Sequence, residues 1–349
     1  MDRPYVSIII PVLNTKPYLI KCLDSLLGQT IQNIEIICVD NGSTDGSLEL
    51  LRRYEKNNQN IIVIEHPPIG RLGGARNAGI EIANGEFIGF VDSDDFVSES
   101  MFNELYSAAC ETTSELAICN VTIFFQKDNR SITAHPKQWL QRDSGFNILD
   151  RPKLLRNLTC WNKLYSSKLI SRLNLRFPEG SFHEDQFFVT KAMISARKIV
   201  ALPESHYFYR KQREGAISLY QDDTSLHIFT VMRTLSSSLK DLLVLNEYSD
   251  LLSELKCSRY LQLFHLTGRR FKYQFFTKMS GELRQMSFSK VPKLLTPSEM
   301  REISVINNTN FAFYRYFLAI RKIYGSLRKK GFRKNWTLWI KKINAGVFS

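Results

Sequence analysis

The chain has 349 residues, 44% of them hydrophobic, so it is long enough for one large catalytic domain or for one domain with a smaller appendage. Its formal net charge of +13 at pH 7 directs attention to acidic partners: nucleotides, nucleic acid and anionic lipid surfaces. No uncharged apolar stretch reaches the roughly 18 residues of a membrane-spanning helix, and the N-terminus lacks a secretory pattern, so we expect a cytoplasmic protein rather than a membrane-spanning or secreted one.

The N-terminal hundred residues alternate between strand and helix patterns. Val6–Val12 is almost continuously apolar and rich in β-branched residues, which is typical of a strand buried on both faces, and Pro11 is expected to mark its end. Helical spacing follows, and the pattern predicts further strands over Ile34–Val39, Ile61–Ile64 and Glu86–Val91. This alternation predicts an α/β fold with helices on both faces of a mostly parallel central sheet.

Beyond about residue 100 the alternation is lost. Residues 128–151 are predicted to be an irregular polar stretch and residues 207–218 a loop, while the apolar spacing from about residue 222 onward is mainly helical. No acidic residue follows Glu302, and this region interleaves basic with aromatic side chains, which suits a helix on an anionic membrane; the alternative is a solvated basic helix bundle. The basic residues are Arg315, Arg321, Lys322, Arg328, Lys329, Lys330, Arg333, Lys334, Lys341 and Lys342.

The loop after the fourth strand holds three carboxylates close together, those of Asp92, Asp94 and Asp95. Their mutual repulsion is costly unless a cation lies among them, and a divalent ion that bridges a diphosphate would remove it. The alternative is an acidic turn that caps the next helix, with Asp95 or Ser98 as the N-cap residue. Because ligands of open α/β sheets bind at the carboxyl ends of the strands, we expect the four strand-end loops to converge on one site.

Two other loops carry candidate binding residues. Asp40 follows the second strand and is placed to accept hydrogen bonds from a base or ribose, with helix capping as the alternative; for Asp45 capping is favoured. Arg76 begins a helix behind a glycine turn, where its guanidinium and the backbone N–H groups can face one anion. The alternative for Arg76 is an ordinary surface arginine.

A second pair of carboxylates, Glu184 and Asp185, lies beside aromatic side chains later in the chain. Desolvation there could raise the pKa of an aspartate from its ordinary value near 3.9 toward that of a useful general base. The preceding His183 is more readily explained as a turn residue than as a metal ligand.

Six motifs occur together in an order that is more specific than any one of them: VSIIIPVLN, EIICVDNGSTDGS, GGARNAGIEIANGEFIGFVDSDDFV, WNKLY, FHEDQFF and YFYRKQREGAIS. Over roughly residues 5–218 they resemble the family 2 glycosyltransferases, which are inverting enzymes of the GT-A fold. The resemblance implies a catalytic domain over residues 1–220, with a nucleotide-sugar-binding half (1–100) and an acceptor-binding half (101–220). Residues 221–349 lie outside the resemblance and form the helical, basic C-terminal region.

The resemblance also implies how a nucleotide-sugar donor is bound. Asp40 would recognise the nucleobase, usually uracil, with Pro11 and Asn14 lining the same pocket. Asp92 and Asp94 match the family's DxD motif, which binds Mn²⁺ or Mg²⁺ and the diphosphate. The resemblance places the following further residues near the donor, the diphosphate or the acceptor: Arg76, Ser93, Asp95, Lys163, Arg210, Arg213 and Ser218.

For the acceptor side, Asp185 matches the family's general base, which removes the proton of the attacking hydroxyl. Glu184 would orient the acceptor or the base. One departure is Asn41, where the family more often has a second aspartate; this puts fine specificity in question more than activity.

The implied function is hexosyl transfer from a nucleotide diphosphate sugar, with a UDP-sugar favoured, to a glycan or lipid-linked glycan of lipopolysaccharide, capsule or a related polysaccharide. We expect a peripheral protein on the cytoplasmic face of the inner membrane, without a nucleic-acid partner. One alternative is a sugar-nucleotide nucleotidyltransferase, which normally needs a Gly-rich basic loop where this chain has Pro-Val-Leu-Asn-Thr. Another is a non-catalytic membrane-binding or nucleic-acid-binding protein on a degenerate transferase scaffold.

Overall fold

The structure is a computed structural model that describes residues 3–68, 71–136, 140–211, 223–241, 245–286 and 292–318. Within them, one sheet of nine strands has the order β3-β2-β1-β4-β8-β6-β9-β5, with β7 paired to β6. The strands are β1 (Val6–Val12), β2 (Ile34–Asp40), β3 (Ile61–Glu65), β4 (Phe87–Phe90), β5 (Phe96–Val97), β6 (Leu116–Phe125), β7 (Arg130–Thr133), β8 (Lys163–Ser166) and β9 (Ile199–Lys211). The helices are α1 (Lys16–Leu27), α2 (Ser47–Asn57), α3 (Arg71–Ile82), α4 (Met101–Thr112), α5 (Ser167–Arg172), α6 (Glu184–Ser195), α7 (His227–Asp241), α8 (Leu245–Leu266), α9 (Lys272–Leu283) and α10 (Pro297–Asn308).

The first half of the sheet is parallel, as the sequence predicts. Strands β3, β2, β1 and β4 all run in the same direction, so the loops that follow them meet at one edge. The predicted strand Val6–Val12 is confirmed, but it ends one residue beyond Pro11, which still pairs with Val39 of β2. Proline is tolerated there because pairing with β4 already ends at Ile9, so its missing N–H interrupts no ladder on that side.

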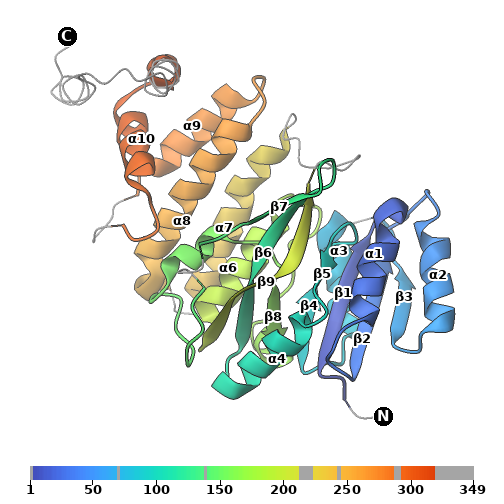
Figure 1. Cartoon of the computed structure of the whole chain (residues 1–349). Helices are drawn as coiled ribbons and strands as arrows, with labels where there is room; N and C mark the ends of the chain where they lie inside the picture. The colour runs from blue at the N-terminus through green and yellow to red at the C-terminus, as the bar shows by residue number, and fades with distance from the viewer. Residues whose placement is uncertain are drawn as a thin grey trace, which may run out of the picture.

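Helices cover both faces of the sheet, and Figure 1 shows α1 on the face toward the viewer, together with α4, which packs on β6, β8 and β9 of the second half. On the other face, α3 approaches β1 unusually closely at Gly79. A Cβ atom added to Gly79 would lie 2.4 Å from Cγ2 of Ile9, which no real contact allows. The glycine at this position therefore lets α3 pack closely against β1.

The second half of the sheet is mixed. Strand β8 is antiparallel to both β4 and β6, and β9 runs parallel to β6 and antiparallel to β5. Two sequence predictions are wrong here: residues 207–211 belong to β9 instead of a loop, and the polar stretch 128–151 contains β7. Strand β9 pairs with β6, which is distant in the sequence, so the local pattern does not reveal its ladder, whereas β7 forms a local hairpin with β6 that the sequence analysis missed. The remainder of the predicted loop, residues 212–218, lies outside the described residues.

Helices α7 to α10 form a further layer beside β6 and β9, in yellow to red in Figure 1. This confirms the predicted helical C-terminal region. Within the layer, the buried Glu302 of α10 accepts a hydrogen bond from the hydroxyl of Tyr314 and lies 2.8 Å from Nε2 of His265. In the described part of the chain, no helix combines the length and the apolar character needed to cross a membrane. Nine of the ten basic tail residues follow residue 318 and lie outside that part.

Candidate active site

Arg76 of α3 lies at the centre of the candidate site, between three carboxylates. Its Nη1 donates hydrogen bonds to Glu184 at 2.8 Å and to Asp185 at 3.0 Å, and its Nη2 donates to Asp92 at 2.9 Å. The side chain of Arg76 is only 2% exposed, whereas those of Asp92 and Asp185 keep 26% and 23% of their surface. The alternative of an ordinary surface arginine is therefore wrong. One guanidinium joins the end of β4 to the start of α6.

The segment before α6 is held against α3 by residues that permit close approach. A Cβ atom added to Gly73 would lie 3.0 Å from the carbonyl oxygen of Pro178 and 3.4 Å from Cγ of Glu184. Asn77 donates to the carbonyl oxygen of Phe177 at 2.9 Å and accepts from its N–H at 2.8 Å. These contacts place the first turn of α6 over Arg76. In the sequence, the only signal for Asn77 is its position next to Arg76.

The charges in this cluster perturb one another strongly. Burial would lower the pKa of Arg76, but the carboxylates of Asp185, Asp92 and Glu184 raise it well above its ordinary value, so this guanidinium stays charged. Burial and the neighbouring Asp185 raise the pKa of Glu184 to about 7, and burial raises the pKa of Asp185, in each case against the opposing effect of Arg76. The two acids share one local environment, so they titrate as a pair. A buried carboxyl with a raised pKa suits general acid–base chemistry.

The acidic loop after β4 brings Asp92, Asp94 and Asp95 together, with one oxygen of each within 4.8 Å of the others. Asp95 is fully buried and accepts hydrogen bonds from the hydroxyl of Tyr207 at 2.8 Å and the N–H of Arg210 at 2.7 Å. Burial and the like charges of Asp94 and Asp92 raise the pKa of Asp95 well above its ordinary value. A divalent cation would relieve this repulsion, and carboxylate oxygens are the ligands that Mg²⁺ and Mn²⁺ prefer, so the residues fit such an ion.

The capping alternative for this loop is not what the structure shows. Helix α4 begins at Met101 with Ser100 as its N-cap residue, so neither Asp95 nor Ser98 occupies that position. Asp95 instead supports the loop from inside, through Tyr207 of β9. Tyr207 also accepts a hydrogen bond from the N–H of Asp92. Sequence analysis missed Tyr207, because the strand that carries it was predicted to be a loop.

Asp40 lies at the end of β2 with one carboxylate oxygen engaged and one available. Oδ2 accepts hydrogen bonds from the N–H groups of Gly42 at 3.1 Å and Ser43 at 3.0 Å, while the buried Oδ1 has no hydrogen-bond partner in the structure. Buried polar atoms rarely stay unpaired, so an orphan acceptor here is suited to a donor group on a ligand. Asn14 lies beside this loop and accepts from the N–H of Thr44 at 2.8 Å.

The loops after β1, β2 and β4 are tied together by hydrogen bonds. Asp45 accepts from the N–H groups of Lys16 at 3.0 Å and Ser47 at 2.9 Å, the first residues of α1 and α2, although the N-cap residues of these helices are Thr15 and Gly46. Ser93 of the acidic loop accepts from the hydroxyl of Thr15 at 2.9 Å. The strand-end loops therefore converge, as the parallel topology predicts.

Of the remaining predicted residues, one contacts the acidic loop, two are buried inside the protein and two lie outside the described residues. Arg210 of β9 donates through Nε to the carbonyl oxygen of Asp94 at 2.7 Å, so it contacts the acidic loop. Lys163 is fully buried and bonds within its own turn, and Pro11 is buried in β1. Arg213 and Ser218 lie outside the described residues. His183 has a left-handed φ of 67° directly before α6, which agrees with a turn residue.

Comparison with known proteins decides the family. The sequence model of Glycosyl transferase family 2 matches residues 7–173. Glycosyltransferase GlyG of Streptococcus pneumoniae is 30% identical over 239 residues, which are 63% of this chain and 75% of that protein. The chain belongs to glycosyltransferase family 2. A second relative of this family 2 chain, the uncharacterized glycosyltransferase EpsJ of Bacillus subtilis, is 36% identical over 219 residues, which are 60% of this chain and 61% of EpsJ. The match to EpsJ thus covers less than two thirds of that protein.

The fold of this family 2 chain resembles that of a solved glycosyltransferase. The crystal structure of TarS residues 1–349 from Staphylococcus aureus in complex with UDP-GlcNAc superposes with a TM-score of 0.70 and covers 89% of each chain at 21% identity. The family 2 chain therefore has the predicted GT-A fold.

Proposed function

We propose that this chain is an inverting glycosyltransferase that moves a sugar from a nucleotide diphosphate, with a UDP-sugar favoured, to an acceptor hydroxyl. The observation that carries the proposal is the shared guanidinium of Arg76. It joins Asp92, from the motif that binds the diphosphate in this family, to Asp185, at the position of the general base. Such a junction brings a leaving group and a base to one place, which an inverting displacement needs.

On the donor side, the unpaired Oδ1 of Asp40 supports recognition of a base edge with an N–H donor, as uracil has. Asp92 and Asp94 would hold Mn²⁺ or Mg²⁺ together with the diphosphate. Such an ion supplies Lewis-acid stabilisation of the charge that develops on the departing diphosphate. Asp95 stays inside the protein, where Tyr207 and Arg210 fix its two oxygens and with them the course of the loop.

On the acceptor side, Asp185 takes the proton of the attacking hydroxyl while that oxygen forms its bond to the anomeric carbon. Attack from the face opposite the diphosphate inverts the configuration at that carbon. The raised pKa of Asp185 makes its carboxylate a stronger base than an exposed aspartate, and Arg76 opposes part of that rise. Glu184 shares Nη1 of Arg76 with Asp185 and orients the base.

We propose that the acceptor is a cell-surface glycan of the lipopolysaccharide or capsule class, or a related polysaccharide. A polymer acceptor is supported by the name of TarS, poly(ribitol-phosphate) beta-N-acetylglucosaminyltransferase, which is 28% identical over 213 residues. TarS has been crystallised in complex with UDP-GlcNAc, which supports a UDP-sugar as the donor here.

The experiment that tests the donor site is thermal unfolding with a panel of sugar nucleotides and nucleoside diphosphates, with and without Mn²⁺. A ligand at 100 times its dissociation constant adds about 2.7 kcal/mol of stability. We expect metal-dependent stabilisation by uridine nucleotides in the wild type and none in Asp94→Ala, with sugar transfer confirmed by product analysis. Stabilisation only by a nucleoside triphosphate with a sugar phosphate would favour a nucleotidyltransferase. No shift with any nucleotide would favour a non-catalytic protein.

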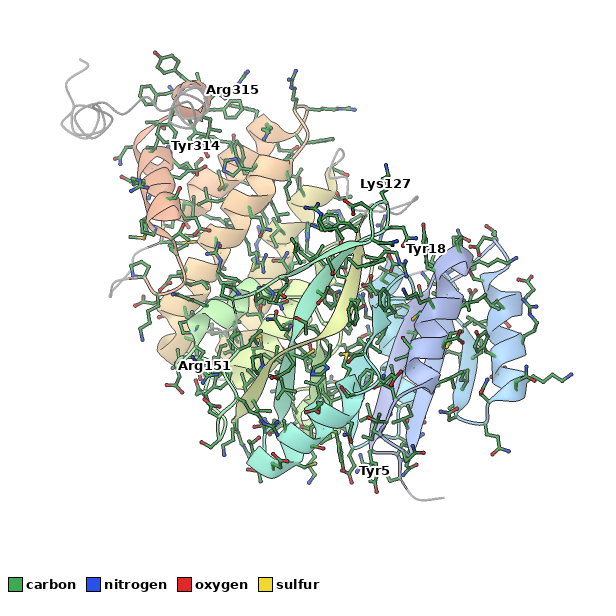
Figure 2. The ribbon with its side chains drawn as sticks, in the orientation of Figure 1. Tyr5, Tyr18, Lys127, Arg151, Tyr314 and Arg315 are labelled. Atoms are coloured by element: carbon green, nitrogen blue, oxygen red, sulfur yellow. The ribbon has the colours of Figure 1, made fainter. Side chains whose placement is uncertain are left out.

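We also propose that the C-terminal region contacts an anionic membrane on its cytoplasmic face. The described part of this region exposes Tyr273 and Tyr316, at 65% and 59%. Tyr273 packs on Phe311 with ring centroids 5.3 Å apart, and the guanidinium of Arg315 lies 5.9 Å from the Phe311 ring. Figure 2 shows Arg315 at the end of the helical layer remote from α2. Residues 266–281 contain four basic and no acidic residues, so the local charge complements anionic headgroups.

Sedimentation with phosphatidylcholine vesicles, with and without phosphatidylglycerol, tests this contact. We expect binding only to the anionic vesicles, and weaker binding in the double variant Arg269→Gln, Arg270→Gln by about 2 kcal/mol, or roughly 30-fold, because each basic residue near the surface contributes about 1 kcal/mol. The matched control, Arg52→Gln with Arg53→Gln, removes two exposed arginines of α2 and should bind as the wild type does. Equal binding by both double variants would refute the proposed surface.

A further inference from the structure

Arg71, the first residue of α3, is an exposed cation that the proposed reaction does not use. Its guanidinium lies over the ring of Phe182, with its central carbon 3.8 Å from the ring centroid. Phe182 belongs to the segment that leads into α6, which carries Glu184 and Asp185. The contact therefore joins the start of α3 to the acceptor side of the site.

The contact between Arg71 and Phe182 lies close to the proposed base. Along α3, Arg71 precedes Arg76 by five residues, which is about 7.5 Å along the helix axis. Along the other segment, Phe182 precedes Asp185 by three residues, and Asp185 accepts a hydrogen bond from Arg76 at 3.0 Å. The same two segments thus meet at both contacts. A group that binds to Arg71 lies near the hydroxyl that Asp185 deprotonates.

The ring under Arg71 is held in place from a second direction. The N–H of Phe182 donates a hydrogen bond to Nδ1 of His227 in α7 at 3.3 Å, and the two rings are 5.6 Å apart with their planes at 71°. Arg71 and His183 both have left-handed backbones, with φ of 60° and 67°. Residues other than glycine rarely take this conformation, which persists only where surrounding contacts fix it. The guanidinium is therefore held against a fixed ring.

The charge of Arg71 is not neutralised within the described part of the chain, where this side chain forms no ion pair. Two acidic side chains of the neighbouring segment bond elsewhere. Glu179 accepts from Asn77 at 3.1 Å, and Glu184 accepts from Arg76 at 2.8 Å. A guanidinium stacked on a ring keeps the N–H donors at its edge for a partner in its own plane. Phosphate and carboxylate groups are such partners, because each accepts two parallel N–H bonds from an arginine.

We propose that Arg71, held over Phe182, binds an anionic group of the acceptor. The inference rests on the proposed function, since that assigns the base to Asp185 and brings the acceptor hydroxyl to it. The acceptor is then a glycan with a phosphate or a carboxylate on the accepting sugar or on the unit next to it. A neutral glycan would leave the charge of Arg71 in water and gain no charge-assisted hydrogen bond from it.

Binding of small anions tests this subsite without measuring transfer. UDP and Mn²⁺ at saturation fill the donor site, and ligand-observed NMR titration then measures dissociation constants for glycerol phosphate and glucuronate, with glycerol and glucose as their neutral counterparts. We expect at least one anion to bind about 10-fold more tightly than its counterpart, and Arg71→Gln to abolish this preference. The anion with the larger preference shows whether the subsite takes a phosphate or a carboxylate.

Arg130→Gln is the matched control. Arg130 of β7 also lies over a phenylalanine ring, 4.4 Å from the centroid of Phe125, but it pairs with Asp128 at 3.6 Å. We expect this variant to bind both anions as the wild type does. If Arg71→Gln unfolds, Arg71→Gly suits the left-handed backbone and repeats the test. An equal loss in the Arg71 variant and the control, or no preference for either anion in the wild type, would overturn the proposal.

Transfer assays connect the subsite to the reaction. With oligosaccharide acceptors in neutral, phosphorylated and uronic acid forms, we expect Arg71→Gln to raise the KM for the anionic acceptor about 10- to 100-fold. Both kcat and the KM for the donor should stay as in the wild type. A raised KM for the donor instead would place Arg71 at the diphosphate and refute the acceptor role. If the anions bind through Arg71 but the wild type transfers no sugar, the subsite is supported and the proposed function fails.

Discussion

Replacing Asp185 with asparagine should lower the rate of sugar transfer by about 10² to 10⁴, the usual contribution of a general base. Asparagine has nearly the same shape and can still accept the hydrogen bond from Nη1 of Arg76, so the cluster should keep its geometry. Its side chain cannot take a proton from the acceptor hydroxyl. Initial rates with saturating donor and acceptor measure the effect, and stabilisation by nucleotide and Mn²⁺ should match that of the wild type.

The pH dependence supplies an independent check on the same residue. The base acts in its ionised form, and burial raises the pKa of Asp185, so kcat should fall with decreasing pH at values above those of an exposed aspartate. Because Glu184 titrates with it, the observed midpoint belongs to the pair. The control is Glu184→Gln, which should slow transfer less than Asp185→Asn does. Near-normal transfer by Asp185→Asn with an inactive Glu184→Gln would assign the base to Glu184.

Replacing Arg76 with methionine should destabilise the fold by about 3 to 5 kcal/mol, the usual effect of removing one partner from a buried ion pair. The three carboxylates lose the cation that they share. Because the Arg76 side chain is only 2% exposed, water does not reach its position to compensate. Arg76→Lys keeps the charge, but it should not restore full stability. The guanidinium of Arg76 reaches Asp92 with Nη2 and α6 with Nη1, and a single ammonium cannot make both contacts. Chemical denaturation at pH 8 measures the difference.

The loss of folding stability in Arg76→Met should depend on pH in a defined direction. Burial raises the pKa of Glu184 to about 7, above its ordinary value of 4.5, so protonation relieves the cluster as the pH falls below 7. Arg76 holds this pKa down, so Glu184 in Arg76→Met should take up its proton at a still higher pH. The stability difference between wild type and Arg76→Met should therefore be largest at alkaline pH and shrink as the pH falls toward 7. The matched control is Arg52→Met: Arg52 also pairs with two carboxylates, Glu55 and Glu65, but it is 43% exposed. Surface pairs contribute about 1 kcal/mol or less, so a loss equal to that of Arg76→Met would contradict the prediction.

Several features of this protein are determined by sequence patterns alone. The apolar runs and the polar residues that follow them predict the parallel strands β1 to β4 and the convergence of their loops, because a strand buried on both faces has an apolar pattern that is visible locally. The joint order of six motifs identified the family that the comparisons show. The helical spacing after residue 222 likewise predicts α7 to α10, since helix periodicity is a local property.

Other features depend on contacts between residues distant in the sequence, and these only the tertiary structure decided. Strand β9 resembles a loop until its pairing with β6 is known, and Tyr207 gains its contact with Asp95 only through that pairing. Arg76 and Asp185 are separated by 109 positions, so nothing local indicates that they form an ion pair. Lys163 follows the same principle: its motif suggested a ligand contact, but burial directs its amine to the Thr159 carbonyl inside the protein. The sequence determines which groups the chain carries, whereas their charge states and partners follow from burial, which exists only in the folded chain.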